Sequence, residues 1–510
     1  MIMKAFLMSK DQDFELQRKL PPNEQALTQD LELDILFNAM ALEDEFVLEV
    51  VKKAVLSNLT DPDTIRYRQN ILKDCLRYPS IVREMYNIAV EAVESERKVY
   101  YGFFSRFAGA ILSRSVEVLQ LLVGRLKKLE NIADEYAGKF KSEGFTALFA
   151  MLRRELDDEY FASIQDHLRE LKFRNGVLVS AELGKGNKGT NYTLLKQQEE
   201  KRGWLNRLFA KNRPQYTFTL NPRDESGARA LSELRDRGIN LAANALAQST
   251  DHILSFFNML RTELAFYVGC LNLYEQLAQE RGPTCFPVPL ARGQRTHSFE
   301  GLYDVCLALK LDQRIVGNDA NADNKDLVII TGANRGGKST FLRSVGLAQL
   351  MMQCGMFVPA KSFSSDVRDG IFTHFKREED ATLKSGKLDE ELSRMSGIVD
   401  HLTPDSMLLF NESFAATNER EGSEIARQII SALLEKGIKV FFVTHLYELA
   451  RGLYEKRMEN ALFLRAERKP DGGRTFRIIE GEPLQTSYGA DLYDRIFAPA
   501  TMFMGTSPPA

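Results

Sequence analysis

Apolar stripes at helical spacing run through the first half of the chain. Proline, which interrupts helices, is absent from residues 80–213 and from residues 223–282. Apolar residues of the second stretch recur at steps of three, four or seven, the spacing of one helix face. They are Leu246, Ile253, Phe257, Leu260, Leu264, Val268, Leu271 and Tyr274. This pattern predicts a helix over 230–278, roughly 70 Å long if Gly238 and Gly269 leave it unbroken.

The pair Asp61-Pro62 predicts the start of a helix earlier in the chain. Aspartate is favoured as an N-cap, and proline fits the first turn because its missing N–H has no partner there. Apolar residues follow at helical spacing until the chain turns before Pro79. We interpret all these stripes as helix-on-helix core rather than as contacts to a cofactor.

Residues 174–222 have a different composition. The segment has several glycines and β-forming residues, and between residues 184 and 216 it has eight basic residues against two acidic ones. Four of these bases are the candidate DNA-binding residues: Lys185, Lys188, Lys201 and Arg202. Their contacts would go to phosphates and carry no sequence information. The alternatives are a solvated loop and, for Trp204, packing on its own hairpin.

The last third of the chain changes periodicity. Short apolar runs at 327–330, 407–410 and 439–443 are each followed by turn residues and then by a helical stretch. This alternation is typical of an α/β domain with a largely parallel sheet. We therefore predict two domains, a helical one at 1–320 and an α/β one at 321–510.

The string GANRGGKST at 332–340 carries the clearest chemistry. It has the pattern GxxxxGK[ST], lies directly after an apolar run and precedes a helical stretch, which is the context that a phosphate-binding loop requires. Glycines let backbone N–H groups curl round phosphates, Lys338 reaches the terminal phosphates, and Ser339 presents a hydroxyl to Mg²⁺.

Polar residues follow two further apolar runs. Asn411 and Glu412 come after the run 407–410, where P-loop ATPases place a metal-assisting Asp and a catalytic Glu. Glu412 can polarise the attacking water as a general base. His445 follows the apolar run at 440–444. Strands of such a sheet end at the edge where ligands bind, so for His445 we favour a phosphate-sensing role over a structural one.

Four blocks in this order resemble the ATPase domain of the MutS family of mismatch-repair proteins. They lie at 331–360, 411–422, 443–449 and 487–492, and residues 59–76 resemble more weakly the helical core and lever of shorter MutS-like proteins. The resemblance implies an ABC-type P-loop ATPase domain with a largely parallel sheet, following a long-helix core and lever domain with a small β-containing, clamp-like insertion.

The resemblance also implies roles for individual residues. The nucleotide-binding residues would be Gly332, Asn334, Gly336, Gly337, Lys338, Ser339 and Thr340. Glu412 would be the catalytic carboxylate, His445 the switch histidine, and Thr417 part of a loop that crosses to the partner subunit. Ser339 and, indirectly, Asn411 would serve the metal. The implied cofactors are ATP and Mg²⁺, and the implied partners are a second copy of the chain and DNA.

The sequence departs from the family pattern at three places, and each changes the function that we expect. Asn411 stands where the family has Asp, which favours slow turnover, because losing a partner of a metal site typically costs about 10–100-fold. Acidic residues occupy the centre of 385–395, where the family has a Ser/Thr-rich trans signature. The sole Phe-x-Glu string, the mark of the mismatch-reading wedge, is 410–412, inside the nucleotide motif. We therefore expect no N-terminal mismatch-recognition domain.

Composition narrows the classes of protein to which the chain can belong. The chain has 510 residues with a net charge of −3, so any nucleic-acid surface must be local. It has no uninterrupted apolar run of 18 residues, and its five cysteines form no CxxC pair. These features disfavour a membrane span, secretion and a zinc site, and they predict a cytoplasmic protein with reduced thiols.

Three functions remain open at this point. The favoured one is a dimeric MutS-like ATPase, a slow ATP hydrolase that acts on DNA structures without reading mismatches. The second is a nucleotide-gated clamp or scaffold that binds ATP, hydrolyses little of it and does not need DNA. A phosphotransferase is less favoured, because the sequence shows no arginine cluster typical of a lid.

Overall fold

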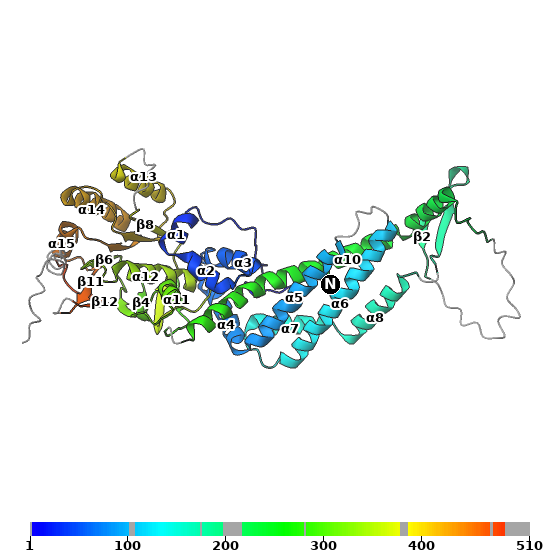
Figure 1. Cartoon of the computed structure of the whole chain (residues 1–510), viewed down its shortest axis with the longest axis horizontal. Helices are drawn as coiled ribbons and strands as arrows, with labels where there is room; N and C mark the ends of the chain where they lie inside the picture. The colour runs from blue at the N-terminus through cyan, green and yellow to red at the C-terminus, as the bar shows by residue number, and fades with distance from the viewer. Residues whose placement is uncertain are drawn as a thin grey trace, which may run out of the picture. The chain divides into compact units, whose positions relative to one another are not determined.

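The computed structural model describes most of the chain. The described ranges are residues 3–100, 108–173, 176–196, 217–279, 282–377, 386–469 and 473–484. The chain divides into two compact units, one of Met1–Ala5 with Ser80–Arg261 and one of Phe6–Pro79 with Thr262–Ala510. This division groups residues 6–79 and 262–320 with the α/β part of the chain. Figure 1 shows the described elements.

The first unit is built of helices. They are α5 (Pro79–Tyr100), α6 (Ala108–Tyr136), α7 (Glu143–Glu155), α8 (Asp158–Glu170) and the first part of α10 (Glu225–Leu277). α6 packs on α7 and α8, and Phe140, Phe145 and Phe149 form an aromatic cluster with ring centroids 4.6–5.7 Å apart. Burial of these aromatic and leucine side chains supplies most of the stability of such a bundle.

A small hairpin interrupts the helices of this unit. β1 (Val179–Leu183) pairs antiparallel with β2 (Gly189–Leu194), and the short 3-10 turn η1 (Lys185–Asn187) connects them. The described part of the insertion at 174–222 therefore contains β-structure, as its composition predicts. Lys201, Arg202 and Trp204 lie outside the described residues.

α10 is one helix of 53 residues, and neither Gly238 nor Gly269 breaks it. Both glycines allow close packing. A Cβ on Gly238 would lie 2.5 Å from the side chain of Val179 in β1, and a Cβ on Gly269 would lie 2.8 Å from Val51 in α3 (Glu45–Val55). The helical prediction for 230–278 is confirmed, and the glycines are explained by their neighbours rather than by a kink.

The second unit begins with four helices: α1 (Glu24–Asp30), α2 (Leu33–Ala41), α3 and α4 (Pro62–Arg77). The predicted start of α4 is confirmed. The Asp61 carboxylate accepts hydrogen bonds from the backbone N–H groups of Asp63 and Thr64, and Pro62 occupies the first turn.

A six-stranded sheet forms the centre of this unit, in the order β12-β11-β6-β10-β9-β8. Its strands are β6 (Leu327–Thr331), β8 (Ile371–Phe375), β9 (Met407–Asn411), β10 (Lys439–Val443), β11 (Ala461–Arg468) and β12 (Arg474–Glu480). All pairings are parallel except that of β12 with β11. The sheet is thus mostly parallel, as the alternation of the sequence predicts.

Helices cover both faces of this sheet. α13 (Lys387–Val399), α14 (Glu419–Glu435) and α15 (Tyr447–Glu455) pack with Leu408 and Phe410 in one core. The intervening residue Leu409 points to the other face, where a Cβ on Gly346 of α12 (Lys338–Gln353) would lie 2.7 Å from it. Because both faces are covered, the central strands β6, β9 and β10 are mostly apolar.

A second, four-stranded sheet completes the unit. Its order is β3 (Val288–Leu290), β7 (Ser362–Asp366), β4 (His297–Leu302) and β5 (Asn318–Asn321), and α11 (Val305–Leu311) connects β4 to β5. In the part of the chain that the structure describes, no helix combines the length and the apolarity that a membrane span requires.

Candidate nucleotide-binding site

The predicted phosphate loop lies between β6 and the N-terminus of α12. Two of its glycines adopt backbone angles that favour glycine, with φ of 116° at Gly332 and 96° at Gly337. A Cβ on Gly332 would lie 2.8 Å from the backbone nitrogen of Ala466 in the neighbouring strand β11. The loop therefore has both the conformation and the tight packing that exclude larger residues.

Lys338 is the first residue of α12, and its side chain turns back over the loop. Its Nζ donates to the carbonyl oxygens of Gly332 at 2.8 Å and Ala333 at 2.9 Å. Burial lowers the pKa of Lys338 to about 8. A phosphate at the helix N-terminus would offer this ammonium a charged partner in place of two neutral carbonyls.

Ser339 and Asn411 meet beside the loop. The Ser339 hydroxyl donates to Asn411 Oδ1 at 2.9 Å, which joins the start of α12 to the end of β9. Mg²⁺ prefers oxygen ligands, and it usually takes several from water and phosphate and few from the protein. These two neutral oxygens beside a phosphate loop fit such a shared ion, which Ser339 and, through its hydroxyl, Asn411 would help to hold.

Glu412 and His445 lie at the ends of adjacent strands, β9 and β10. His445 Nε2 donates to Glu412 Oε1 at 2.7 Å. This hydrogen bond holds the pKa of the Glu412 carboxyl below its usual value. Glu412 is thus ionised at neutral pH, and the bond leaves its Oε2 to accept a proton from water.

The remaining sequence candidates have varied surroundings. Asn334 is exposed, Gly336 is buried against Ala466, and Thr340 is half-buried in the first turn of α12. Thr417 donates to the carboxylate of Glu421 within its own chain, just before α14. Contact of Thr417 with a second subunit stays a prediction.

The DNA-binding candidates belong to the other unit. Lys185 and Lys188 are exposed around the turn of the β1–β2 hairpin. Lys201 and Arg202 lie outside the described residues. Only half of this set can therefore be placed on an element, and their role stays a prediction.

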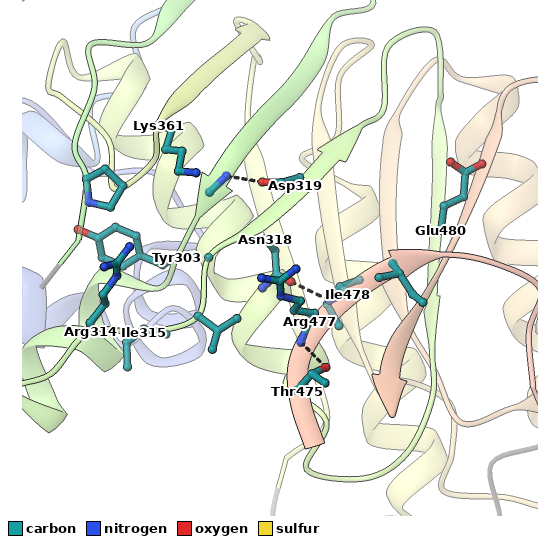
Figure 2. Close-up of a pocket in the computed structure, with 15 residues that line it drawn as sticks. Tyr303, Arg314, Ile315, Asn318, Asp319, Lys361, Thr475, Arg477, Ile478 and Glu480 are labelled. Atoms are coloured by element: carbon teal, nitrogen blue, oxygen red, sulfur yellow. Dashed lines mark hydrogen bonds between the residues drawn. The ribbon is translucent and has the colours of Figure 1, made fainter. Parts of the chain in front are cut away.

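Sequence reasoning missed a cavity of about 640 Å³ next to the loop (Figure 2). Arg314, Asn318, Thr475 and Arg477 are among the residues that line it. Phe476, between two of these residues, connects the cavity to the loop: its carbonyl oxygen lies 3.4 Å from a Cβ built on Gly337. Asn318 joins β5 to the strand that contains Phe476, β12, because its Oδ1 accepts a hydrogen bond from the Ile478 backbone N–H at 2.7 Å.

No local signal marks these cavity residues. They come from β12 and from β5 with the segment before it, which are more than 150 residues apart in the chain, as the Asn318–Ile478 bond shows. Within the described ranges, no group of three or more His, Cys, Asp and Glu gathers to hold a metal.

A strand, a glycine loop and a helix with its lysine over the loop define a P-loop nucleotide-binding domain. Residues 328–505 match the family model described as MutS domain V, and residues 60–280 match the one described as the MutS2 N-terminal domain. The chain belongs to the MutS family. The resemblance carried by the sequence motifs is thereby confirmed at the level of the family.

Individual relatives match only part of the chain. The DNA mismatch repair protein MutS of Thermotoga sp. (strain RQ2) is 35% identical over 187 residues, 36% of this chain and 23% of that protein. The protein of the same name from Alkaliphilus oremlandii is 27% identical over 288 residues, 54% of this chain and 33% of that protein. The chain thus spans about a quarter to a third of the length of these curated relatives.

Proposed function

We propose that this chain is an ATPase that binds ATP with Mg²⁺ and hydrolyses it slowly through Glu412. The observation that carries the proposal is the meeting of Lys338, Ser339–Asn411 and Glu412–His445 at the carboxyl edge of three adjacent parallel strands. Ligands of open α/β sheets bind at this edge.

The proposed site has a place for each part of ATP. The loop and Lys338 would hold the terminal phosphates, and the cavity beyond Phe476 would hold the base, with the guanidinium groups of Arg314 and Arg477 available to stack on it. Mg²⁺ would neutralise charge that develops on the phosphates.

Glu412 would take a proton from the attacking water. The carboxylate is ionised because His445 stabilises it, so it can accept the proton, but a carboxylate with a lowered pKa is a weak base. Asn411 adds no charge beside the metal. Both features support slow turnover, which is also what the alternative of a nucleotide-gated clamp or scaffold requires.

Hydrolysis separates these two functions. We expect the full chain to release phosphate from ATP slowly, and we expect Glu412→Gln to reduce kcat by at least about 100-fold while ATP affinity persists. Glu435→Gln, at an exposed position near the end of α14, is the matched control. ATP binding without Glu412-dependent release would favour the clamp or scaffold.

We further propose that DNA is bound through the basic insertion and without mismatch reading. Lys185 and Lys188 are exposed on the hairpin, and the sole Phe-x-Glu string cannot act as a wedge because Phe410 is fully buried against Phe442. Binding to matched, mismatched, branched and single-stranded DNA should be compared at one stated salt concentration. A clear preference for mismatched duplex would contradict this proposal.

Replacing Lys185, Lys188, Lys201 and Arg202 with glutamine tests the location of the DNA surface. Every DNA ligand should lose affinity, and the log–log salt slope should flatten by up to about 0.9 per lost duplex phosphate contact. An unchanged slope would place the DNA surface elsewhere.

We also propose that the domain is of the ABC type and acts as a homodimer. The half-buried loop at 415–417, which the family resemblance assigns to the subunit boundary, supports this arrangement. Light scattering of the full chain with ATP tests it, and a strictly monomeric species at high concentration would contradict it.

A further inference from the structure

The turn that carries Glu412 has an unusual backbone. Glu412 and Phe414 both have left-handed angles, with φ of 55° and 62°. For residues other than glycine this conformation costs about 1–2 kcal/mol each, and it persists only where surrounding contacts impose it. The contacts that impose it here come from three separate segments.

The first segment is β8, through His374. This buried imidazole stacks on the ring of Phe414, with centroids 5.2 Å apart and planes 18° apart. Its Nδ1 lies 2.7 Å from the hydroxyl of Ser413, and that hydroxyl also lies 2.5 Å from the carbonyl oxygen of His374. Ser413 is fully buried, so its single proton is used entirely within this cluster.

The second segment is α13, through Glu391. Burial raises the pKa of the Glu391 carboxyl, and a hydrogen bond from the Phe414 backbone opposes this rise, so the buried carboxylate faces the turn. The helix also accepts a hydrogen bond from His374 Nε2 at its Glu391 carbonyl, 3.0 Å away. Because Nε2 donates, a neutral ring carries no proton on Nδ1, the nitrogen that faces the Ser413 hydroxyl.

The third segment is the first turn of α14. A side chain on Gly422 would overlap the carbonyl oxygen of Phe414. Glycine therefore lets the helix approach the turn closely. Glu391 Oε2 has no hydrogen-bond partner among the described residues, and the Phe414 backbone and the charges of Arg394 and Lys376 stabilise the carboxylate.

We propose that Glu391 and His374 are positioning residues that hold the Glu412 turn in its left-handed conformation, so that a displacement of α13 displaces the catalytic carboxylate. The proposal rests on the proposed function, because it gives Glu412 the role of the base. It also assigns α13, at the position of the family's trans signature, a contact with the active site of its own chain.

The test compares three variants of the full chain. Glu391→Ala removes the acceptor for the Phe414 N–H, and Glu391→Gln keeps an acceptor oxygen without the charge. Asp389→Ala removes an exposed carboxylate from the same helix and serves as the control. The measurements are kcat and KM for phosphate release, hydrogen exchange of a peptide spanning 412–416, and the thermal midpoint.

We expect Glu391→Ala to lower kcat at least about tenfold with KM changed less than about twofold, because the base is misplaced while the phosphate loop is intact. Amide exchange in 412–416 should accelerate at least about tenfold. Glu391→Gln should restore most of both properties, and Asp389→Ala should change neither.

Two results would overturn the proposal. One is a lower thermal midpoint for Glu391→Ala with unchanged kcat and unchanged exchange, which a merely structural carboxylate would give. The other is an equal loss in Glu391→Gln, which would assign the effect to charge. If the native chain shows no Glu412-dependent hydrolysis, the proposed function fails, and the exchange measurement alone decides whether Glu391 holds the turn.

Discussion

The phosphate loop and the Glu412 turn lie at the same edge of one sheet, but they reach left-handed backbone angles in different ways. The loop uses glycine at Gly332 and Gly337, where the conformation costs little, and has one other left-handed residue, Arg335, with φ of 57°. The turn uses Glu412 and Phe414, for which the conformation is strained. A loop built from glycines is specified locally, whereas a strained turn depends on distant contacts.

This difference extends to the chemistry. In the proposed function Lys338 needs only to reach the phosphates, and its local contacts are the carbonyl oxygens of its own loop. The Glu412 carboxylate must point at a water, so its orientation matters as well as its presence. Substitutions in the loop should therefore remove binding, and substitutions around the turn should remove turnover.

The largest expected effect is that of Lys338→Ala. We expect ATP affinity to fall at least about 100-fold with the fold retained, because removing one partner of a desolvated charged contact typically costs about 2–5 kcal/mol. Equilibrium binding of labelled ATP and the thermal midpoint are the measurements. Lys325→Ala is the matched control, since Lys325 Nζ also donates to a backbone carbonyl, that of Glu459, but away from the loop. Undiminished affinity in Lys338→Ala would contradict the assignment of the loop.

The turn can be disturbed from outside the site by Gly422→Ala. The new methyl group would overlap the Phe414 carbonyl, and relieving such overlap typically costs about 1–3 kcal/mol. We expect a lower free energy of unfolding and a reduced kcat, with ATP affinity preserved. Denaturant unfolding and phosphate release measure the two effects.

Gly452→Ala in α15 is the control for this prediction. A Cβ at Gly452 meets nothing within 4 Å, so alanine there should stabilise the helix by up to about 1 kcal/mol. If Gly422→Ala behaves like Gly452→Ala, the turn tolerates displacement of α14, and the contrast between the two loops is wrong.

Features that are local in sequence could be predicted. The Asp61 cap, the unbroken stripe of α10 and the strand–loop–helix context of Lys338 each depend on residues within a few turns of one another. The location of Glu412 and His445 at the end of apolar runs was also expected, but their hydrogen bond to each other was not predicted.

Features that join distant segments could not be predicted. The acidic centre of 385–395 was unexplained in the sequence, yet the structure turns Glu391 inward onto Phe414. The cavity wall at Asn318 and Ile478 likewise needs two segments whose pairing no local pattern indicates. The grouping of residues 262–320 with the α/β part also joins distant segments, because β7 pairs with β3 and β4 from before residue 320.

A smaller effect is expected for Asn411→Asp. A carboxylate can still accept the Ser339 hydroxyl and adds a charge beside the metal, so the apparent Mg²⁺ affinity in the presence of ATP should rise about tenfold. Mg²⁺ titrations of phosphate release measure it. Without Mg²⁺ the new charge lies next to Glu412, so the thermal midpoint should fall and then recover when the ion is added. Unchanged Mg²⁺ dependence would show that Asn411 is fully competent and would weaken the case for a slow switch.

The smallest change is one of pH alone, and it separates the loop from the turn. Burial lowers the pKa of Lys338 to about 8, so roughly nine-tenths of the side chain is charged at pH 7 and roughly one-tenth at pH 9. Because phosphate binds the charged form, binding above pH 8 must take up a proton, and ATP affinity should fall about tenfold from pH 7 to pH 9. Lys338→Arg is the control: arginine stays charged throughout this range, so its affinity, whatever its value at pH 7, should not show this loss. The Glu412 carboxyl has a pKa below its usual value and stays ionised across the same range, so kcat at saturating ATP should not follow this titration. An equal fall in affinity for the arginine variant would mean that another group controls the binding, and that Lys338 does not respond to phosphate as its buried position predicts.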